Sequence, residues 1–178
     1  MKQSSYAWSR AYARQAQADL EAREALLGAP APACQHLHFL QMACEKIAKA
    51  HRCLGGADPE TLMHGHGFAA KVLPQVAREL LRRSTFGADL QVKHVGIEAM
   101  VRQLAREVDL LAPAVDDDGR RPDNCEYPWK DAGGALHVPA EHGFGSLETL
   151  HRHRTGVTFL KIVIAAATEL GGDFHFPS

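Results

Sequence analysis

The segment CQHLHFLQMACEKIAKAHRCLGG, residues 34–56, repeats its apolar side chains at a helical spacing over its whole length. Intervals of three or four residues separate Leu37, Leu40, Cys44, Ile47, His51 and Leu54. This spacing places them on one face of an α-helix, and the pair Gly55-Gly56 provides a natural end. The segment therefore predicts a long amphipathic helix with one face in a hydrophobic core.

Four further segments have the same period, and each is bounded by glycine, proline or a capping residue. They span residues 6–27, 68–83, about 90–111 and 146 to about 170. Many alanines and few aromatic residues (7%) also favour helices over a β-rich fold. We expect Asp58-Pro59 to begin a short turn and Ser146 to cap the last helix. Pro74 should either kink the third helix or mark its start.

The 178 residues are 46% hydrophobic, which suits one globular domain over residues 1–178. We therefore predict an all-α fold, a mostly antiparallel bundle of about five helices with a long irregular loop before the last one. The last helix is apolar nearly all round in its second half, so we expect it to be the most buried. The predicted core includes Leu40, Cys44, Ile47, Val101, Leu104, Leu160 and Ile164.

The segment 113–145 has no sustained period and is longer than most loops, which indicates a functional, disordered or hairpin-forming stretch. It carries 7 acidic and 3 basic side chains, a net charge of −4, whereas the whole chain has a net charge of −1. No global positive field is therefore expected to attract nucleic acid or an anionic membrane. The longest strongly apolar stretch, residues 162–167, is too short for a membrane span, and we expect a soluble cytoplasmic protein.

Cysteine and histidine chemistry is weakly indicated. The four cysteines form no C-x-x-C pair and are predicted to be free thiols, and acidic neighbours should raise the pKa of Cys125. His151 and His153 are two residues apart on a predicted helix and do not share a face. His64 and His66 lie in a predicted loop and could chelate a metal, but the sequence supplies no further ligands for them. We therefore predict no metal and no cofactor. On the 34–56 helix, Glu45 should pair with Lys49, and Lys46 and Lys49 should be solvated.

Three features resemble HEPN domains, small α-helical bundles of higher eukaryotes and prokaryotes. QMACEKIAKA, residues 41–50, resembles their Q-x-A-x-E-K-x-x-K-A segment. NCEYP, residues 124–128, is similar to the R-Y-P element that many of them carry before a last apolar helix. His64 resembles the histidine that often begins their third helix. The layout matches over about residues 5–170.

The resemblance implies an all-α homodimer that binds a mononucleotide or RNA, often with a nucleotidyltransferase-type partner protein, in a toxin–antitoxin-like or defence system. Active HEPN ribonucleases use an arginine followed by four to six residues and a histidine, and no arginine of this chain has histidine at that offset. We therefore predict a noncatalytic binding or protein-interaction module with no catalytic residue. The alternatives are a divergent metal-independent ribonuclease using Arg121 with His142 or Glu126, and a metal-dependent hydrolase built on His64 and His66.

The predicted ligand site is where the 113–145 loop meets the start of the last helix. Arginines there suit phosphate, aromatic rings suit a base, and free backbone N–H groups suit an anion. Its predicted residues are Arg120, Arg121, Asn124, Tyr127, Trp129, His142, Gly145 and Ser146. The acidic side chains of the same loop favour a mononucleotide, or a basic partner protein, over RNA. The structural alternative is that Arg121 pairs with Asp117 or Asp123, while the two aromatic rings pin the loop to the bundle.

Overall fold

A computed structural model describes residues 2–83, 94–113 and 123–172. The described residues contain five long helices and one short helix: α1 (Lys2–Leu27), α2 (Ala33–Leu54), α3 (Pro59–Met63), α4 (Ala69–Arg83), α5 (His94–Asp109) and α6 (Arg154–Gly171). The segment before α6 contains a two-stranded antiparallel hairpin and three 3-10 turns: β1 (Trp129–Lys130), β2 (Leu136–His137), η3 (Pro139–Glu141), η4 (Gly145–Leu147) and η5 (Leu150–Arg152). The predicted all-α antiparallel bundle is confirmed.

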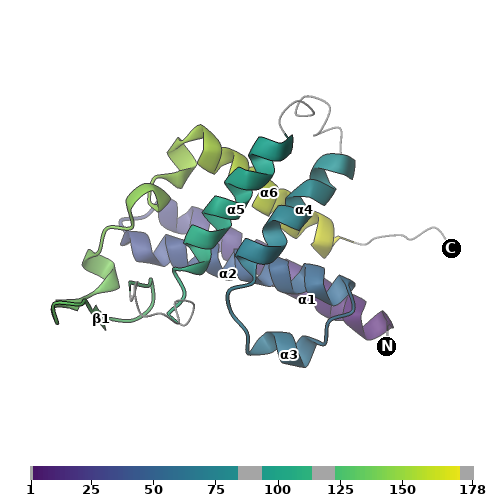
Figure 1. Ribbon diagram of the computed structural model, residues 1–178, viewed down its shortest axis with the longest axis horizontal. Helices are drawn as coiled ribbons and strands as arrows, with labels where there is room; N and C mark the ends of the chain where they lie inside the picture. Colours follow the sequence, from purple (N-terminus) through teal and green to yellow (C-terminus); the bar gives the residue numbers. More distant parts are fainter. Residues whose placement is uncertain (1, 84–93, 114–122, 173–178) are drawn as a thin grey trace.

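The helices form two pairs with α6 beside both. The long pair α1 and α2 follows the long axis of the molecule, α4 and α5 form an inclined pair, and the hairpin lies at one end (Figure 1). Helix α2 contacts α1, α4, α5 and α6, so it is the central helix of the bundle. None of the helices in the described part of the chain is long and apolar enough to cross a membrane.

Capping residues, prolines and glycines in the sequence account for several helix boundaries. Asp58 caps α3, because its Oδ2 accepts a hydrogen bond from the backbone N–H of Thr61 at 3.1 Å and Pro59 takes the first helical position. Pro74 lies inside α4 and is buried, so the helix begins before it. Helix α2 ends at Gly55 and Gly56, and Gly56 adopts a φ of 86° that favours glycine.

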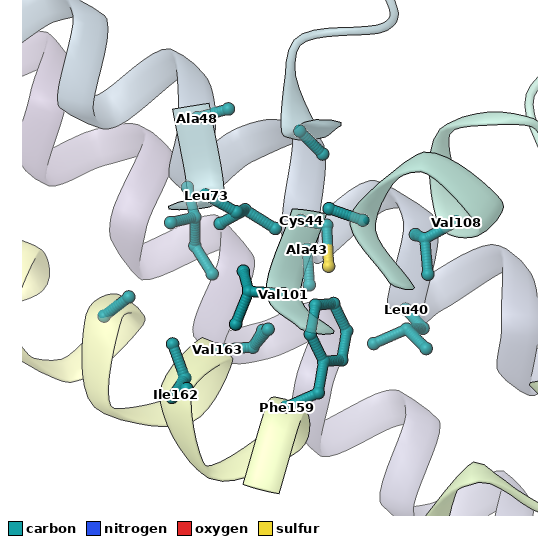
Figure 2. Packing of buried hydrophobic residues seen from close by; sticks show 14 of the residues in the cluster. Leu40, Ala43, Cys44, Ala48, Leu73, Val101, Val108, Phe159, Ile162 and Val163 are labelled. Atoms are coloured by element: carbon teal, nitrogen blue, oxygen red, sulfur yellow. The ribbon is translucent and has the colours of Figure 1, made fainter. Parts of the chain in front are cut away.

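The core is built mainly from α2, α4, α5 and α6, and Ala13 and Ala16 of α1 also belong to it. Figure 2 shows the Phe159 ring of α6 among side chains of the other helices. Leu40, Cys44, Ile47, Val101 and Leu160 are buried, as predicted. Leu104 is only partly buried. Ile164 was assigned to the wrong face, because its side chain is 51% exposed. The buried stripe of α6 follows Phe159, Ile162, Val163, Ala166, Ala167 and Leu170, and a helix that is apolar on all sides does not show its phase in sequence.

The start of the last helix also differs from the prediction. Ser146 lies in η4 and α6 begins only at Arg154, after an extended residue at His153. The turn η5 crosses directly over the first turn of α6 at Gly156. A Cβ atom added to Gly156 would lie 2.0 Å from the carbonyl oxygen of Leu150. The two backbones therefore approach each other so closely that no side chain fits at residue 156.

Replacing Gly156 with alanine is expected to lower the free energy of unfolding by about 1–3 kcal/mol, because η5 and α6 must move apart. Gly96 in α5 is the matched control, since a Cβ atom there meets nothing within 4 Å. Gly96→Ala should leave the stability unchanged or raise it by up to about 1 kcal/mol. Urea unfolding of the two variants measures the difference, and equal stabilities would contradict the close approach.

Candidate anion-binding groove

The predicted loop site is only partly described, since Arg120 and Arg121 lie outside the described residues. Asn124 is buried, and its Oδ1 accepts hydrogen bonds from the backbone N–H groups of Glu126 (2.9 Å) and Tyr127 (2.7 Å). This is an Asx-type turn that shapes the loop. Tyr127 itself is 61% exposed.

Trp129 does not offer a free face to a ligand. Its ring is buried, stacks on His137 with ring centroids 5.6 Å apart, and meets the edge of His142 at 4.8 Å. Phe144 covers His142 from another side, at 4.9 Å between the ring centroids. Its neighbours in the hairpin and the following turn therefore leave little of the Trp129 surface for a base, and the loop site stays a prediction.

The backbone around Gly145 and Ser146, where we predicted an anion site, does not begin a long helix. The backbone N–H of Phe144 donates to Oε1 of Glu148 at 2.5 Å, so a carboxylate of the chain already binds there. Gly145 has a φ of 60° and begins a 3-10 turn, so the positive end of a long helix is absent from this position. An added anion would be repelled by Glu148.

The residues of the two catalytic alternatives have other neighbours. His142 Nε2 lies 3.8 Å from Asp123, and Glu126 lies 3.6 Å from His38 of α2. His64 is the exposed C-cap residue of α3. No three His, Cys, Asp or Glu side chains of the described residues lie together so that they could hold a metal ion.

The four cysteines are free thiols, as predicted, and all four are buried. Burial raises the pKa of Cys125 to about 12, and Glu126 adds to this rise. The sequence indicated the acidic contribution, but burial is the larger cause. A thiol with such a pKa stays protonated at neutral pH and is a poor nucleophile.

A groove between α4 and α5 gathers cations that the sequence analysis did not group. Its volume is about 750 Å³. The lining residues are His66, Gly67, Ala70, Lys71, Ala99, Arg102, Gln103, Arg106, Asp109 and Leu110. Three of them carry a fixed positive charge, and Asp109 is the one acidic residue in this lining. The volume lies within the range of small-ligand sites.

The cations of the groove are available to a ligand. Lys71 and Arg106 are exposed, and neither has an ion-pair partner within the described residues. Arg102 donates to Oε1 of Glu98 at 3.2 Å, but Glu98 also binds Arg78, so its charge is shared. Arg102 and Arg106 are four residues apart on α5 and therefore lie on one face of the helix.

His66 is oriented by a buried carboxylate. Its Nδ1 lies 2.8 Å from Oε2 of Glu45 in α2. Because the ionised carboxylate can only accept, His66 carries its proton on Nδ1, and Nε2 on the other side of the ring is free to bind a ligand. Glu45 also accepts from Lys49 Nζ at 2.6 Å and from Gln41 Nε2 at 3.1 Å. Burial alone would raise the pKa of Glu45, but the bonds from Lys49 and His66 outweigh it and lower the pKa.

The burial of this network corrects the prediction that the lysines of α2 are solvated. Glu45 is 3% exposed and Lys49 is 5% exposed, and Lys46 binds Asp19 of α1 at 2.6 Å. The expected Glu45–Lys49 pair is present. Its burial follows from the central position of α2, which contacts four other long helices.

Asp109 lines the groove and caps α4. Its two carboxylate oxygens accept the backbone N–H groups of Ala69 (3.2 Å) and Ala70 (2.8 Å). Burial raises the pKa of Asp109 to about 6, although these two hydrogen bonds act to lower it. The negative charge of Asp109 is directed at the helix end and is compensated there.

The resulting site has three exposed cations, a histidine of fixed orientation and one acidic side chain engaged by backbone N–H groups. Such an arrangement can bind an oxyanion through charge-assisted hydrogen bonds. The sequence feature that could have indicated this groove is the pair Arg102 and Arg106, two arginines four residues apart on a predicted helix.

Comparisons of the chain with protein-family models, with curated proteins and with solved structures found no match.

Proposed function

We propose that the protein is a HEPN-like binding module for a phosphate-bearing ligand, and that the phosphate binds in the α4–α5 groove rather than at the loop. The observation that carries the proposal is the groove lining, which contains Lys71, Arg102 and Arg106 and one acidic residue, Asp109, which caps α4. Arginine suits this task because its planar fork bonds two oxygens of a phosphate at once.

The HEPN-like segment of α2 supports the same location. Glu45 belongs to that segment and holds His66 at the edge of the groove. A nucleoside monophosphate is the ligand that we favour, because its size agrees with a groove of about 750 Å³. The acidic loop 113–145 would oppose a long polyanion. A homodimer and a nucleotidyltransferase-type partner are implied by the resemblance and stay predictions.

Calorimetric titration with AMP, GMP and a short single-stranded RNA tests the proposal. We expect the wild-type protein to bind a mononucleotide and Arg106→Gln to bind it about tenfold more weakly, since one charged hydrogen bond is lost. Arg82→Gln is the matched control, because Arg82 is an exposed arginine of α4 outside the groove lining. It should bind like the wild type.

Two results would contradict the proposal. One is the absence of any binding in the millimolar range. The other is a loss of binding in Arg121→Ala together with unchanged binding in Arg106→Gln, which would place the ligand at the loop. Cleavage of the RNA by the wild-type protein would instead favour the divergent ribonuclease.

A further inference from the structure

Another cavity lies where α2, α4 and α6 end. Its volume is about 290 Å³, and the three helices contact one another in every pairing. The lining residues are His51, Leu54 and Gly55 at the end of α2, Val76, Glu79, Leu80 and Arg83 of α4, and Ala166, Glu169 and Leu170 of α6. The α4–α5 groove shares none of these residues, so the two sites are separate.

Half of the lining residues carry apolar side chains. Val76, Leu80, Ala166 and Leu170 are buried members of the hydrophobic core. Leu54 adds apolar surface that is 39% exposed. Because this part of the lining offers few hydrogen-bond partners to water, an apolar group of a ligand is favoured there.

The polar side chains of the lining form a connected row. His51 Nε2 lies 3.3 Å from Oε1 of Glu79. Arg83 Nη2 lies 3.7 Å from Oε2 of the same carboxylate, and Arg83 Nη1 donates to Oε1 of Glu169 at 3.0 Å. The row therefore contains two carboxylates and one permanent cation, Arg83.

The helix ends make the cavity more negative. The carboxyl end of an α-helix carries a partial charge of about −0.5 elementary charge. Helices α2, α4 and α6 end at Leu54, Arg83 and Gly171, and residues from the last turn of each line the cavity. Arg52, which also lies in the last turn of α2, packs over the Phe68 ring at 4.7 Å and does not belong to the lining.

Arg83 is the member of the row that a ligand can replace. Its side chain is 62% exposed, so its guanidinium can be hydrated outside the cavity. Glu79 and Glu169 are close enough for this one guanidinium to contact both of them. An ammonium group has three N–H donors and can therefore bond both carboxylates in its place.

We propose that this cavity binds a small primary amine. The ammonium group bonds Glu79 and Glu169, and an apolar part of about the size of one aromatic ring lies against the apolar lining. A volume of about 290 Å³ is at the lower limit of small-ligand sites and suits a molecule of this size. An anion is disfavoured, because two carboxylates and three helix ends oppose it and only Arg83 attracts it.

Calorimetric titration at pH 7 with benzylamine, benzyl alcohol and benzoate tests the proposal. The three probes share one ring and differ in the charge of the attached group. We expect saturable binding of benzylamine in the millimolar range. The alcohol and benzoate should bind at least about tenfold more weakly, since neither forms a charge-assisted bond with the carboxylates.

Variants of the row give effects of opposite sign. Glu169→Gln should bind benzylamine about tenfold more weakly, because one charged hydrogen bond is lost. Arg83→Gln should bind it at least as tightly as the wild type, because a competing cation is removed. Glu21→Gln is the control, since Glu21 is an exposed glutamate of α1 outside the lining, and its binding should not change.

Backbone amide resonances of the wild-type protein locate the probe without any variant. We expect saturable shifts at Leu54, Leu80 and Leu170 during titration with benzylamine. Shifts gathered at the α4–α5 groove instead, or no saturable shift in the millimolar range, would overturn the proposal. The same holds if benzoate binds as tightly as benzylamine, or if Arg83→Gln loses benzylamine binding.

Discussion

Replacing Lys49 with methionine is expected to lower the free energy of unfolding by about 3–5 kcal/mol. The substitution keeps the length of the side chain but leaves Glu45 as a buried charge that has lost its cationic partner at 2.6 Å. His66 and Gln41 still bond Glu45, but neither carries a permanent charge. Urea unfolding at pH 7 measures the loss.

Two variants make this test specific. Lys161→Met removes an exposed lysine of α6 and should change the stability by less than about 0.5 kcal/mol. The double variant Glu45→Gln/Lys49→Met removes both charges and should recover part of the loss, because a buried neutral amide is less costly than a buried unpaired carboxylate. A loss below about 1 kcal/mol in Lys49→Met would show that water reaches Glu45.

The sign of the pH dependence follows from the lowered pKa of Glu45 in the folded wild type. A lowered pKa stabilises the fold above the ordinary pKa of glutamate, and this contribution is lost as the pH falls. Without Lys49, burial dominates and the pKa of Glu45 rises, so the variant gains relative stability when Glu45 becomes protonated. The difference between wild type and Lys49→Met should therefore shrink between pH 7 and pH 4.

The sequence predicted the helices well because their burial pattern is periodic. Residues 34–56 show one apolar face, and α2 ends at the two glycines as predicted. The N-terminal cap of α3 at Asp58 depends on neighbouring residues alone and was also predicted from the sequence. What depends only on neighbours within about four positions along the chain could be deduced.

Features that depend on contacts between distant segments could not be deduced. Ser146 is a suitable cap, yet α6 begins at Arg154, and the Leu150 backbone of the preceding turn packs directly against Gly156. The Glu45–Lys49 pair was predicted from its spacing, but its burial needed the position of α2 among four other helices. The contact between Glu45 and His66 joins residues 21 positions apart.

The candidate site was harder to predict for the same reason. The sequence shows which aromatic residues the loop contains, but it does not show which of them are covered. The Trp129 ring stacks on His137, which the hairpin register places opposite it. Lys71 and Arg106 come from different helices, and only the packing of α4 against α5 brings them to one groove. Single charged residues on two predicted helices do not reveal which helix faces lie side by side.

Replacing Phe159 with alanine is expected to lower the free energy of unfolding by about 3–5 kcal/mol, since its ring is fully buried and a cavity would be left between α2, α5 and α6. Ile164→Ala is the matched control on the same helix. Its side chain is 51% exposed, so the loss should be below about 1 kcal/mol. The difference between the two variants shows which face of α6 is turned toward the bundle. The sequence does not determine this face, because the helix is apolar on nearly all sides. A larger loss for Ile164→Ala than for Phe159→Ala would mean that α6 presents its other face to the bundle, and with it that the close approach of η5 to Gly156 is wrong.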